Sequence, residues 1–118
     1  MKQDIDLIFH ICLYFFQLII MVSIKARIIE VVERNPDCTS RFIAETTGIK
    51  KEVVWQELKY MVKVKWLNRR EDKIVIKGTP YRAYRYTLSD RANLAIQEYG
   101  SFRNYEIAKI KKRMEKLL

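Results

Sequence analysis

The sequence predicts one mainly α domain with a small β-hairpin, an α+β class, over residues 1–118. A chain of this length is enough for one compact domain and too short for two ordinary ones. Only three glycines and two prolines interrupt it, which favours long helices with few turns. The runs that combine β-branched and aromatic residues in the manner of strands lie close together, within residues 73–88, and this predicts a hairpin.

The amino-terminal segment has no charged residue from Leu7 to Ile24. As a helix these residues span about 27 Å, which is marginal for a bilayer, and they lack the basic start and small-residue cleavage site of a signal peptide. A helix that is apolar on nearly all sides needs cover from lipid or from protein, and one small domain covers only one side. We therefore expect residues 1–22 to form a dimerisation helix; a membrane anchor is the alternative.

The helical pattern continues beyond this segment. One face of it carries the apolar residues Ile24, Ile28, Val31 and Val32. We expect Asp4 or Asp6 to cap the start of the helix. Asn35-Pro36-Asp37 is expected to end it, because proline disfavours the helical conformation of the residue before it. The pattern leaves open whether residues 4–34 form one helix or two joined near Ser23.

Two shorter helices are expected next. Thr39 or Ser40 caps a short helix that ends at Gly48. A third helix covers residues 51–63, because this segment has apolar residues at i, i+4 and i+7. They are Val54, Leu58 and Met61.

The expected elements after residue 66 are strands at residues 73–76 and 81–88 and helices at residues 91–99 and 102–118. Residues 77–80 join the strands, and Ser89 or Asp90 caps the first of these helices. The last helix carries a short coiled-coil seam. We expect it to pack against the first helix, so that the homodimer interface joins residues 5–22 to residues 102–118. Its expected contacts are Ile8, Phe15, Ile19, Ile107, Ile110, Met114 and Leu117.

Cysteine and histidine give no sign of catalysis. Cys12 and Cys38 form no CxxC pair, so we expect small buried side chains in a reducing compartment, with a disulfide between two copies as the alternative. The single histidine, His10, lies in an apolar run and makes a poor general base. Three glycines cannot build a GxGxxG or P-loop motif. The sequence therefore predicts no enzyme, no cofactor and no metal.

The positive charge is concentrated in one part of the chain. The net charge is +9, and residues 50–86 hold eleven basic and four acidic side chains. Residues 1–49, by contrast, hold five basic and six acidic side chains. A localised positive field of this kind indicates a polyanionic partner.

The segment from residue 43 to residue 49 reads Ile-Ala-Glu-Thr-Thr-Gly-Ile. It places a small residue where two helices cross, and four residues later a glycine that can take the left-handed conformation of a turn. Trp66-Leu67 is an apolar pair before the hairpin, and residues 84–89 combine a returning strand with a helix cap. In this order the residues resemble the winged helix-turn-helix DNA-binding regulators. The similarity is to the MarR type and to the small kind frequent in archaea and their viruses.

The resemblance covers residues 23–99, with two departures. Lys50 replaces the usual Ser/Thr cap of the recognition helix, and Lys65 stands where a glycine often precedes the wing. The resemblance implies that helix 51–63 enters the major groove and that the wing, residues 68–86, contacts the backbone or the minor groove. It also implies dimerisation through paired first and last helices.

The residues themselves suit this role. Gln56 can pair bidentately with adenine, and the lysines can reach phosphates or guanine. Trp55 can pack on a thymine methyl group; a core or dimer tryptophan is its alternative role. For the hairpin, the alternative is a solvated edge strand protected by charge. The expected DNA-binding residues are Lys50, Lys51, Trp55, Gln56, Lys59, Lys63, Arg69, Arg70, Lys73, Lys77, Arg82 and Arg85.

We therefore expect a sequence-specific double-stranded DNA-binding protein that acts as a homodimeric transcription regulator. The expected location is the cytoplasm, that of the host if the protein is viral. A low share of Gln and Asn beside abundant Lys, Arg, Ile and Val leans towards a thermophile. The alternative function is a membrane-tethered or protein-interaction winged-helix module.

Overall fold

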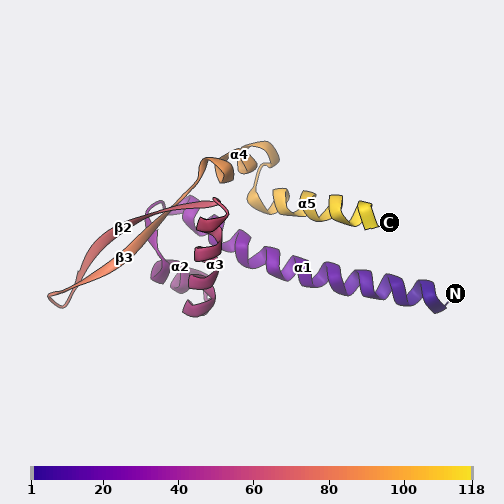
Figure 1. Ribbon diagram of the computed structural model, residues 1–118, viewed down its shortest axis with the longest axis horizontal. Helices are drawn as coiled ribbons and strands as arrows, with labels where there is room; N and C mark the ends of the chain where they lie inside the picture. The colour runs from indigo at the N-terminus through magenta and orange to yellow at the C-terminus, as the bar shows by residue number, and fades with distance from the viewer. Residues whose placement is uncertain (1, 118) are drawn as a thin grey trace.

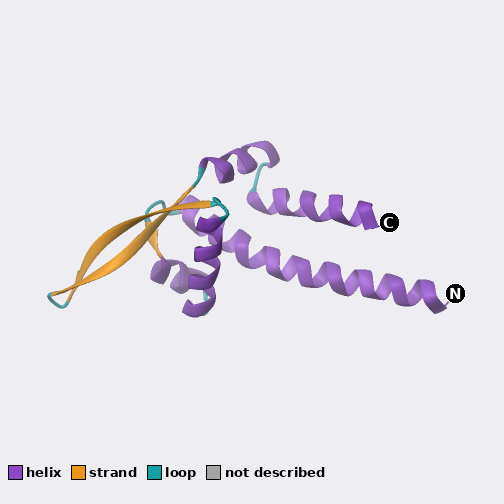
Figure 2. Cartoon of the chain, in the orientation of Figure 1, coloured by secondary structure: helices purple, strands orange, loops and turns teal. Residues whose placement is uncertain are grey.

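The computed structural model describes the backbone of residues 2–117 and the side chains of residues 7–13 and 24–117. Within these residues the chain forms five helices and a three-stranded antiparallel sheet (Figures 1 and 2). The expected α+β class is confirmed. The elements in order are α1 (Lys2–Arg34), β1 (Cys38–Thr39), α2 (Ser40–Thr47), α3 (Lys51–Lys63), β2 (Leu67–Ile76), β3 (Thr79–Leu88), α4 (Asp90–Tyr99) and α5 (Phe102–Leu117).

The molecule is elongated, with extents of 69 × 29 × 21 Å. At one end α1 and α5 pack against each other and carry both chain termini, and at the other end the hairpin of β2 and β3 projects from the body (Figure 1). The helices α2 and α3 lie between these two projections. The hydrophobic core is therefore small and central, and two slender elements extend from it in opposite directions.

The first helix is continuous. It runs from Lys2 to Arg34 without a break, which settles the question of one helix or two. The expectation that Asp4 or Asp6 caps it is wrong, because the helix already begins before both residues. Its carboxyl half supplies the core with side chains of 0–1% exposure: Ala26, Ile28, Ile29 and Val32. These are the positions at which a 3.6-residue period returns to one face.

Local capping rules explain α2 and the turn into α3. Thr39 caps α2, since its hydroxyl accepts a hydrogen bond of 3.2 Å from the Phe42 amide. Gly48 ends α2 with a positive φ of 73°, as expected of a left-handed helix terminus. Lys50 makes no side-chain cap for α3. The inward stripe is as predicted, and its three members Val54, Leu58 and Met61 are fully buried.

The hairpin is longer than the sequence predicts. Its two strands pair over ten residues each, from Leu67↔Leu88 to Ile76↔Thr79. The expected strands at residues 73–76 and 81–88 end where predicted, but both begin earlier than predicted, and the expected loop at residues 77–80 is two residues too long. The first half of β2 was not predicted as a strand, because its charged residues lack the pattern of a strand. The turn is only two residues, Lys77 and Gly78, and both have positive φ, which matches the right-handed twist of a hairpin.

The junction between α3 and the hairpin contains Lys65, the second departure from the pattern that the sequence resembles. Lys65 adopts the left-handed conformation, with φ of 65°, which explains why a glycine is favoured there. The buried Ser89 hydroxyl donates to the carbonyls of Lys65 (2.6 Å) and Trp66 (2.9 Å) and accepts from the Ala92 amide. Ser89 therefore caps α4 and closes the base of the hairpin at the same time.

Candidate nucleic-acid interface

The outward face of α3 carries an exposed tryptophan beside a lysine. Trp55 is 49% exposed, so its alternative role in the core of the chain is wrong. The Lys59 ammonium lies 4.0 Å from the centre of its ring, a cation–π contact that holds both side chains at the surface. Lys50, Lys51 and Lys63 are exposed as well. This part of α3 offers an aromatic surface within a group of positive charges.

Gln56 lies elsewhere on α3 than this pair. It is exposed, and it borders a shallow hollow of about 350 Å³ together with Ile24 of α1 and Val53, Glu52 and Glu57 of α3. The expected base-reading glutamine is thus placed on the edge of α3 that faces α1. The structure brings Gln56, Trp55 and Lys59 onto one exposed helix, with Trp55 and Lys59 in direct contact.

The hairpin arginines are engaged within the protein. Arg85 donates to Asp72 (2.6 Å) and to the backbone carbonyl of Asp37 (2.9 Å). Arg70 pairs with Asp37 at 3.3 Å. Arg85 is the main reason that the pKa of Asp72 is lowered, through their hydrogen bond.

Two more arginines have partners on the hairpin itself. Arg82 pairs with Glu71 of the neighbouring strand, and the Arg69 guanidinium lies 4.4 Å from the centre of the Tyr84 ring. These contacts fasten the strands to each other, while Arg85 and Arg70 fasten them to the loop after α1. No sequence pattern indicates this role, because the Arg85–Asp37 contact spans 48 positions of the chain.

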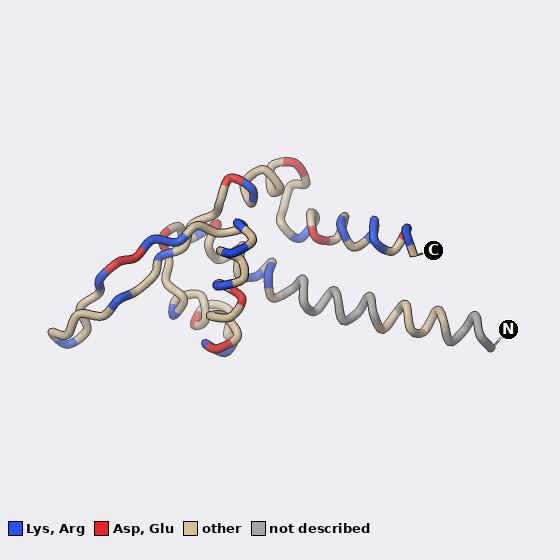
Figure 3. Tube along the Cα trace, viewed as in Figure 1, with Lys and Arg blue, Asp and Glu red and all other residues tan. Residues whose placement is uncertain are grey.

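The two hairpin lysines differ from the arginines. Among the described residues no ion pair includes Lys73 or Lys77, and both side chains are exposed. They lie on the outer half of the hairpin, and Figure 3 shows basic residues along the hairpin, on α3 and again along α5. The positive charge therefore occupies both ends of the molecule. On the hairpin, the two lysines outside the ion pairs lie on its outer half.

The expected dimer residues divide into four groups. Ile8, Ile107 and Leu117 are exposed and remain available for contact with a second copy. Ile110 is 4% exposed within the single chain, so it packs in the protomer's own interior and has little surface left for the expected contact with a second copy. Met114 is half-buried. The side chains of Phe15 and Ile19 lie outside the described residues.

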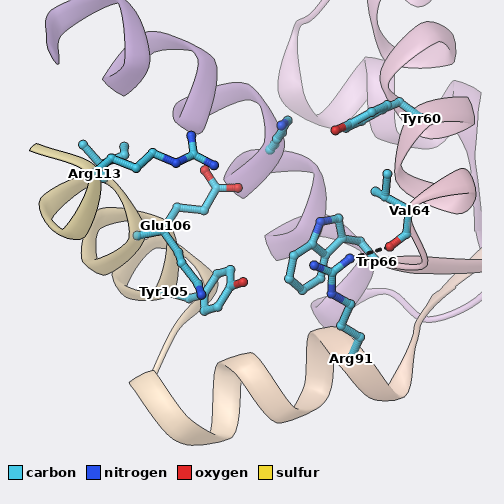
Figure 4. Close-up of a pocket in the computed structure, with 10 residues that line it drawn as sticks. Tyr60, Val64, Trp66, Arg91, Tyr105, Glu106 and Arg113 are labelled. Carbon is cyan, nitrogen blue, oxygen red and sulfur yellow. Dashed lines mark hydrogen bonds between the residues drawn. The ribbon is translucent and has the colours of Figure 1, made fainter. Parts of the chain in front are cut away.

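Sequence reasoning missed a pocket of about 460 Å³ between α1, α3, α4 and α5 (Figure 4). Four cationic side chains line it, together with three aromatic ones and one carboxylate: Lys25, Arg91, Lys109, Arg113, Tyr60, Trp66, Tyr105 and Glu106. Arg91 lies 3.8 Å from the centre of the Trp66 ring and donates to the Val64 carbonyl. The aromatic wall is thereby fixed at the junction of all four helices.

Glu106 is the unusual group of this pocket. Burial raises its pKa to about 7; the charge of Glu57 on α3 adds to the rise, and Lys25 on α1 opposes it. The Arg113 side chain points toward the Glu106 carboxyl group in Figure 4, and Lys109 and Arg91 complete the charged surroundings. No sequence pattern marks this residue, since its burial arises from the packing of three helices.

Glu106→Gln is expected to flatten the dependence of stability on pH. The native pKa of about 7 lies above the ordinary value of 4.5, so the native state binds more protons between these pH values. Stability therefore falls as pH rises through this window and levels off above it. The amide avoids this loss and should raise the free energy of unfolding by about 1–3 kcal/mol at pH 8, with little effect at pH 4.

Urea unfolding at a fixed protein concentration, from pH 4 to pH 8, measures the difference. Glu115→Gln is the matched control, because Glu115 is an exposed carboxylate on the same helix. Equal pH profiles for the wild-type protein and Glu106→Gln would contradict the burial of a charged carboxylate.

Comparison with known proteins shows a similarity of fold. No family model and no curated protein matches the chain. The fold is similar to the crystal structure of RV1404 from Mycobacterium tuberculosis, with a TM-score of 0.51 and 16% sequence identity over 91% of this chain and 79% of that chain. At this identity the similarity concerns the fold alone.

Two further findings bear on the first helix and the cysteines. In the part of the chain that the structure describes, no helix has both the length and the apolar character needed to cross a bilayer. Cys38 is buried, as expected, whereas Cys12 is exposed on α1, which corrects the expectation that both are buried.

Proposed function

We propose that this protein is a homodimeric regulator of the winged helix-turn-helix type that binds double-stranded DNA. In this proposal α3 enters the major groove, and the hairpin of β2 and β3 contacts the backbone or the minor groove. The observation that carries the proposal is the placement of the exposed lysines. They lie on α3 and on the outer half of the hairpin, and strand β2 of this hairpin contacts α3.

The connection between α2 and α3 supports the helix-turn-helix part. Only three residues separate the two helices, and Gly48 supplies the left-handed conformation at the first of them. Short turns that contain glycine are typical of this motif. Ile43 and Ala44 of α2 and Val54 and Leu58 of α3 are buried in the same core, so α3 is fixed while its other face stays exposed.

The internal contacts of the arginines support the role of the hairpin. An exposed two-stranded hairpin is marginally stable alone, yet Arg85 and Arg70 anchor this one to Asp37. A hairpin held in a fixed direction loses less conformational entropy when it binds. The arginines thus position the hairpin, and the lysines near its tip are left to meet phosphates.

Two variants distinguish sequence-specific recognition of DNA bases from sequence-independent binding to phosphates. Gln56→Ala should weaken binding to a site selected from random DNA by about 1–3 kcal/mol and leave random duplex almost unaffected, because its amide reads a base edge. Lys73→Ala combined with Lys77→Ala should weaken binding to both duplexes by about tenfold or more, because phosphates carry no sequence information. Fluorescence anisotropy on the two labelled duplexes measures both effects.

Matched controls exist on other helices. Gln97→Ala removes an exposed amide from α4, and Lys111→Ala combined with Lys112→Ala removes the same charge from α5; each should leave affinity within about twofold. If the α5 lysines matter as much as the hairpin lysines, net charge rather than a defined interface attracts the DNA. If Gln56→Ala weakens binding to both duplexes equally, another residue recognises the bases, and Trp55 and Lys59 are the next candidates.

A further inference from the structure

The tip of the hairpin is apolar on both of its faces and exposed. Val75 is 68% exposed, Tyr81 is 51% exposed and Ile76 is 42% exposed. The strand register pairs Val75 with Pro80 on one face and Ile74 with Tyr81 on the other. Nothing in the described residues covers this tip, which projects away from the body in Figure 1. Exposed apolar side chains grouped in this way mark a contact surface.

Positive charge surrounds this apolar tip. Lys77 stands at the turn, and Lys73 and Arg82 face each other across the strands directly behind the apolar residues. Among the described residues Lys73 and Lys77 belong to no ion pair, whereas Arg82 pairs with Glu71. An apolar wedge with flanking cations is complementary to a groove of DNA, in which stacked bases lie between two rows of phosphates.

The hairpin is long enough for its tip to reach the minor groove next to the major groove that α3 enters in the proposed function. From Leu67 to Ile76 the strand advances about 30 Å at about 3.3 Å per residue. One turn of duplex is about 34 Å, so the adjacent minor groove lies about 17 Å from the centre of the major groove. A hairpin beside α3 is therefore longer than a contact with the nearest phosphates requires.

The width of the hairpin limits its entry into the minor groove. Its strands lie about 4.8 Å apart, and their side chains make the hairpin broader still, whereas the minor groove of B-DNA is about 6 Å wide. The tip enters only if the groove opens. Apolar side chains that push between base pairs open the groove and kink the duplex toward the major groove.

We propose that the apolar tip, Val75, Ile76 and Tyr81, inserts into the minor groove and bends the DNA. This inference rests on the proposed function and adds to it a deformation of the partner. It assigns Lys73 and Lys77 to the phosphates beside the inserted tip. The steps that unstack most easily are pyrimidine–purine steps such as TpA, so the tip gives the protein a preference for DNA that kinks readily.

Ligase-mediated ring closure tests the bend without knowledge of the target sequence. A duplex of about 120 bp is shorter than the persistence length of about 150 bp, so it closes rarely on its own. The wild-type protein is expected to raise the yield of circles at least tenfold. The triple variant Val75→Thr, Ile76→Thr, Tyr81→Thr should lose this gain and still bind the linear duplex within about threefold, because the lysines remain.

Several measurements keep the result interpretable. Threonine retains strand propensity, and an unchanged thermal midpoint shows that the variant folds; Leu94→Gln on α4 is the control for loss of an exposed apolar side chain. If the variant does not fold, the wild-type protein alone decides: 2-aminopurine placed at TpA steps must brighten on binding, because unstacking relieves its quenching.

The outcomes separate this inference from the function on which it rests. Wild-type protein that binds linear duplex without more circles, or a folded variant that makes as many circles, overturns the bend and leaves DNA binding in place. Absence of any binding to duplex overturns both proposals. Flotation with phosphatidylserine vesicles that depends on the three tip residues, without any gain in circles, overturns the inference in favour of a lipid surface.

Discussion

Raising the salt concentration from about 50 to about 200 mM is expected to weaken binding to random duplex about a thousandfold. Each phosphate that a lysine neutralises releases counterions, and the slope of log K against log salt is about −0.9 per phosphate. Contacts with about six phosphates by the dimer give a slope on the order of −5. The lysines available in each protomer lie on α3 and the outer hairpin: Lys50, Lys51, Lys59, Lys63, Lys73 and Lys77.

Fluorescence anisotropy across a salt series measures the slope. The variant with Lys73→Ala and Lys77→Ala should flatten it by roughly one unit for each contact that is lost. The hairpin arginines should add little, because Arg70, Arg82 and Arg85 already pair with carboxylates. A slope near zero would leave the concentrated positive charge without a role and would favour a protein partner.

Local rules allowed much of the fold to be predicted. The ends of α2 and the start of α4 follow from Thr39, Gly48 and Ser89, each of which acts on its near neighbours. The buried stripe of α3 follows from its spacing alone. These features depend on a few adjacent residues, so a single sequence is sufficient to find them.

Long-range pairing explains what was missed. The strand β1 has two residues and exists only because Cys38 and Thr39 pair with Tyr86 and Arg85 of β3. The inner half of β2 is exposed and charged, so its sequence lacks the alternation of a half-buried strand. In both cases the partner strand, rather than the local sequence, determines the conformation.

The candidate site shows the same division. The exposed positions on α3 could be predicted from its period, and Trp55 and Lys59 are at the surface as expected. The sequence cannot distinguish an arginine that is free to bind phosphate from one that is paired within the protein and stabilises the fold. Arg85 was expected to bind DNA, yet its partner Asp37 belongs to the loop after α1. Charge counts therefore overstate the number of groups free to bind DNA.

Changing the uncovered side chains of α1 to charged ones is expected to convert a dimer into monomers. The helix has 33 residues and α5 has 16, so at about 1.5 Å per residue α5 is about half as long as α1. Near the amino-terminal end of α1 the described side chains are uncovered: Leu7 is 59% exposed, and Ile8 and Phe9 are each 61% exposed. A second copy of the chain, which carries the same apolar surface, provides the missing cover.

The variant Ile8→Glu with Phe9→Glu should halve the mass measured by light scattering and weaken DNA binding by more than tenfold. A monomer reaches only one half-site, and the gain from joining two binding units is lost. Among the described residues of α1, the fully buried ones lie between Ala26 and Val32, far along the helix from the change, so the fold should stay intact. Leu94→Glu on α4 is the control, since it places the same charge at another exposed leucine.

Deletion of residues 1–20 tests the same interface more severely. Without them the chain should be monomeric, or it should aggregate through the exposed apolar residues of α5, Ile107 and Leu117. A soluble deletion product that remains dimeric would show that α1 does not hold the protomers together. A monomeric full-length protein would be equally decisive, because the apolar surface of α1 would then need another cover, and a protein or lipid partner would take the place of the second copy.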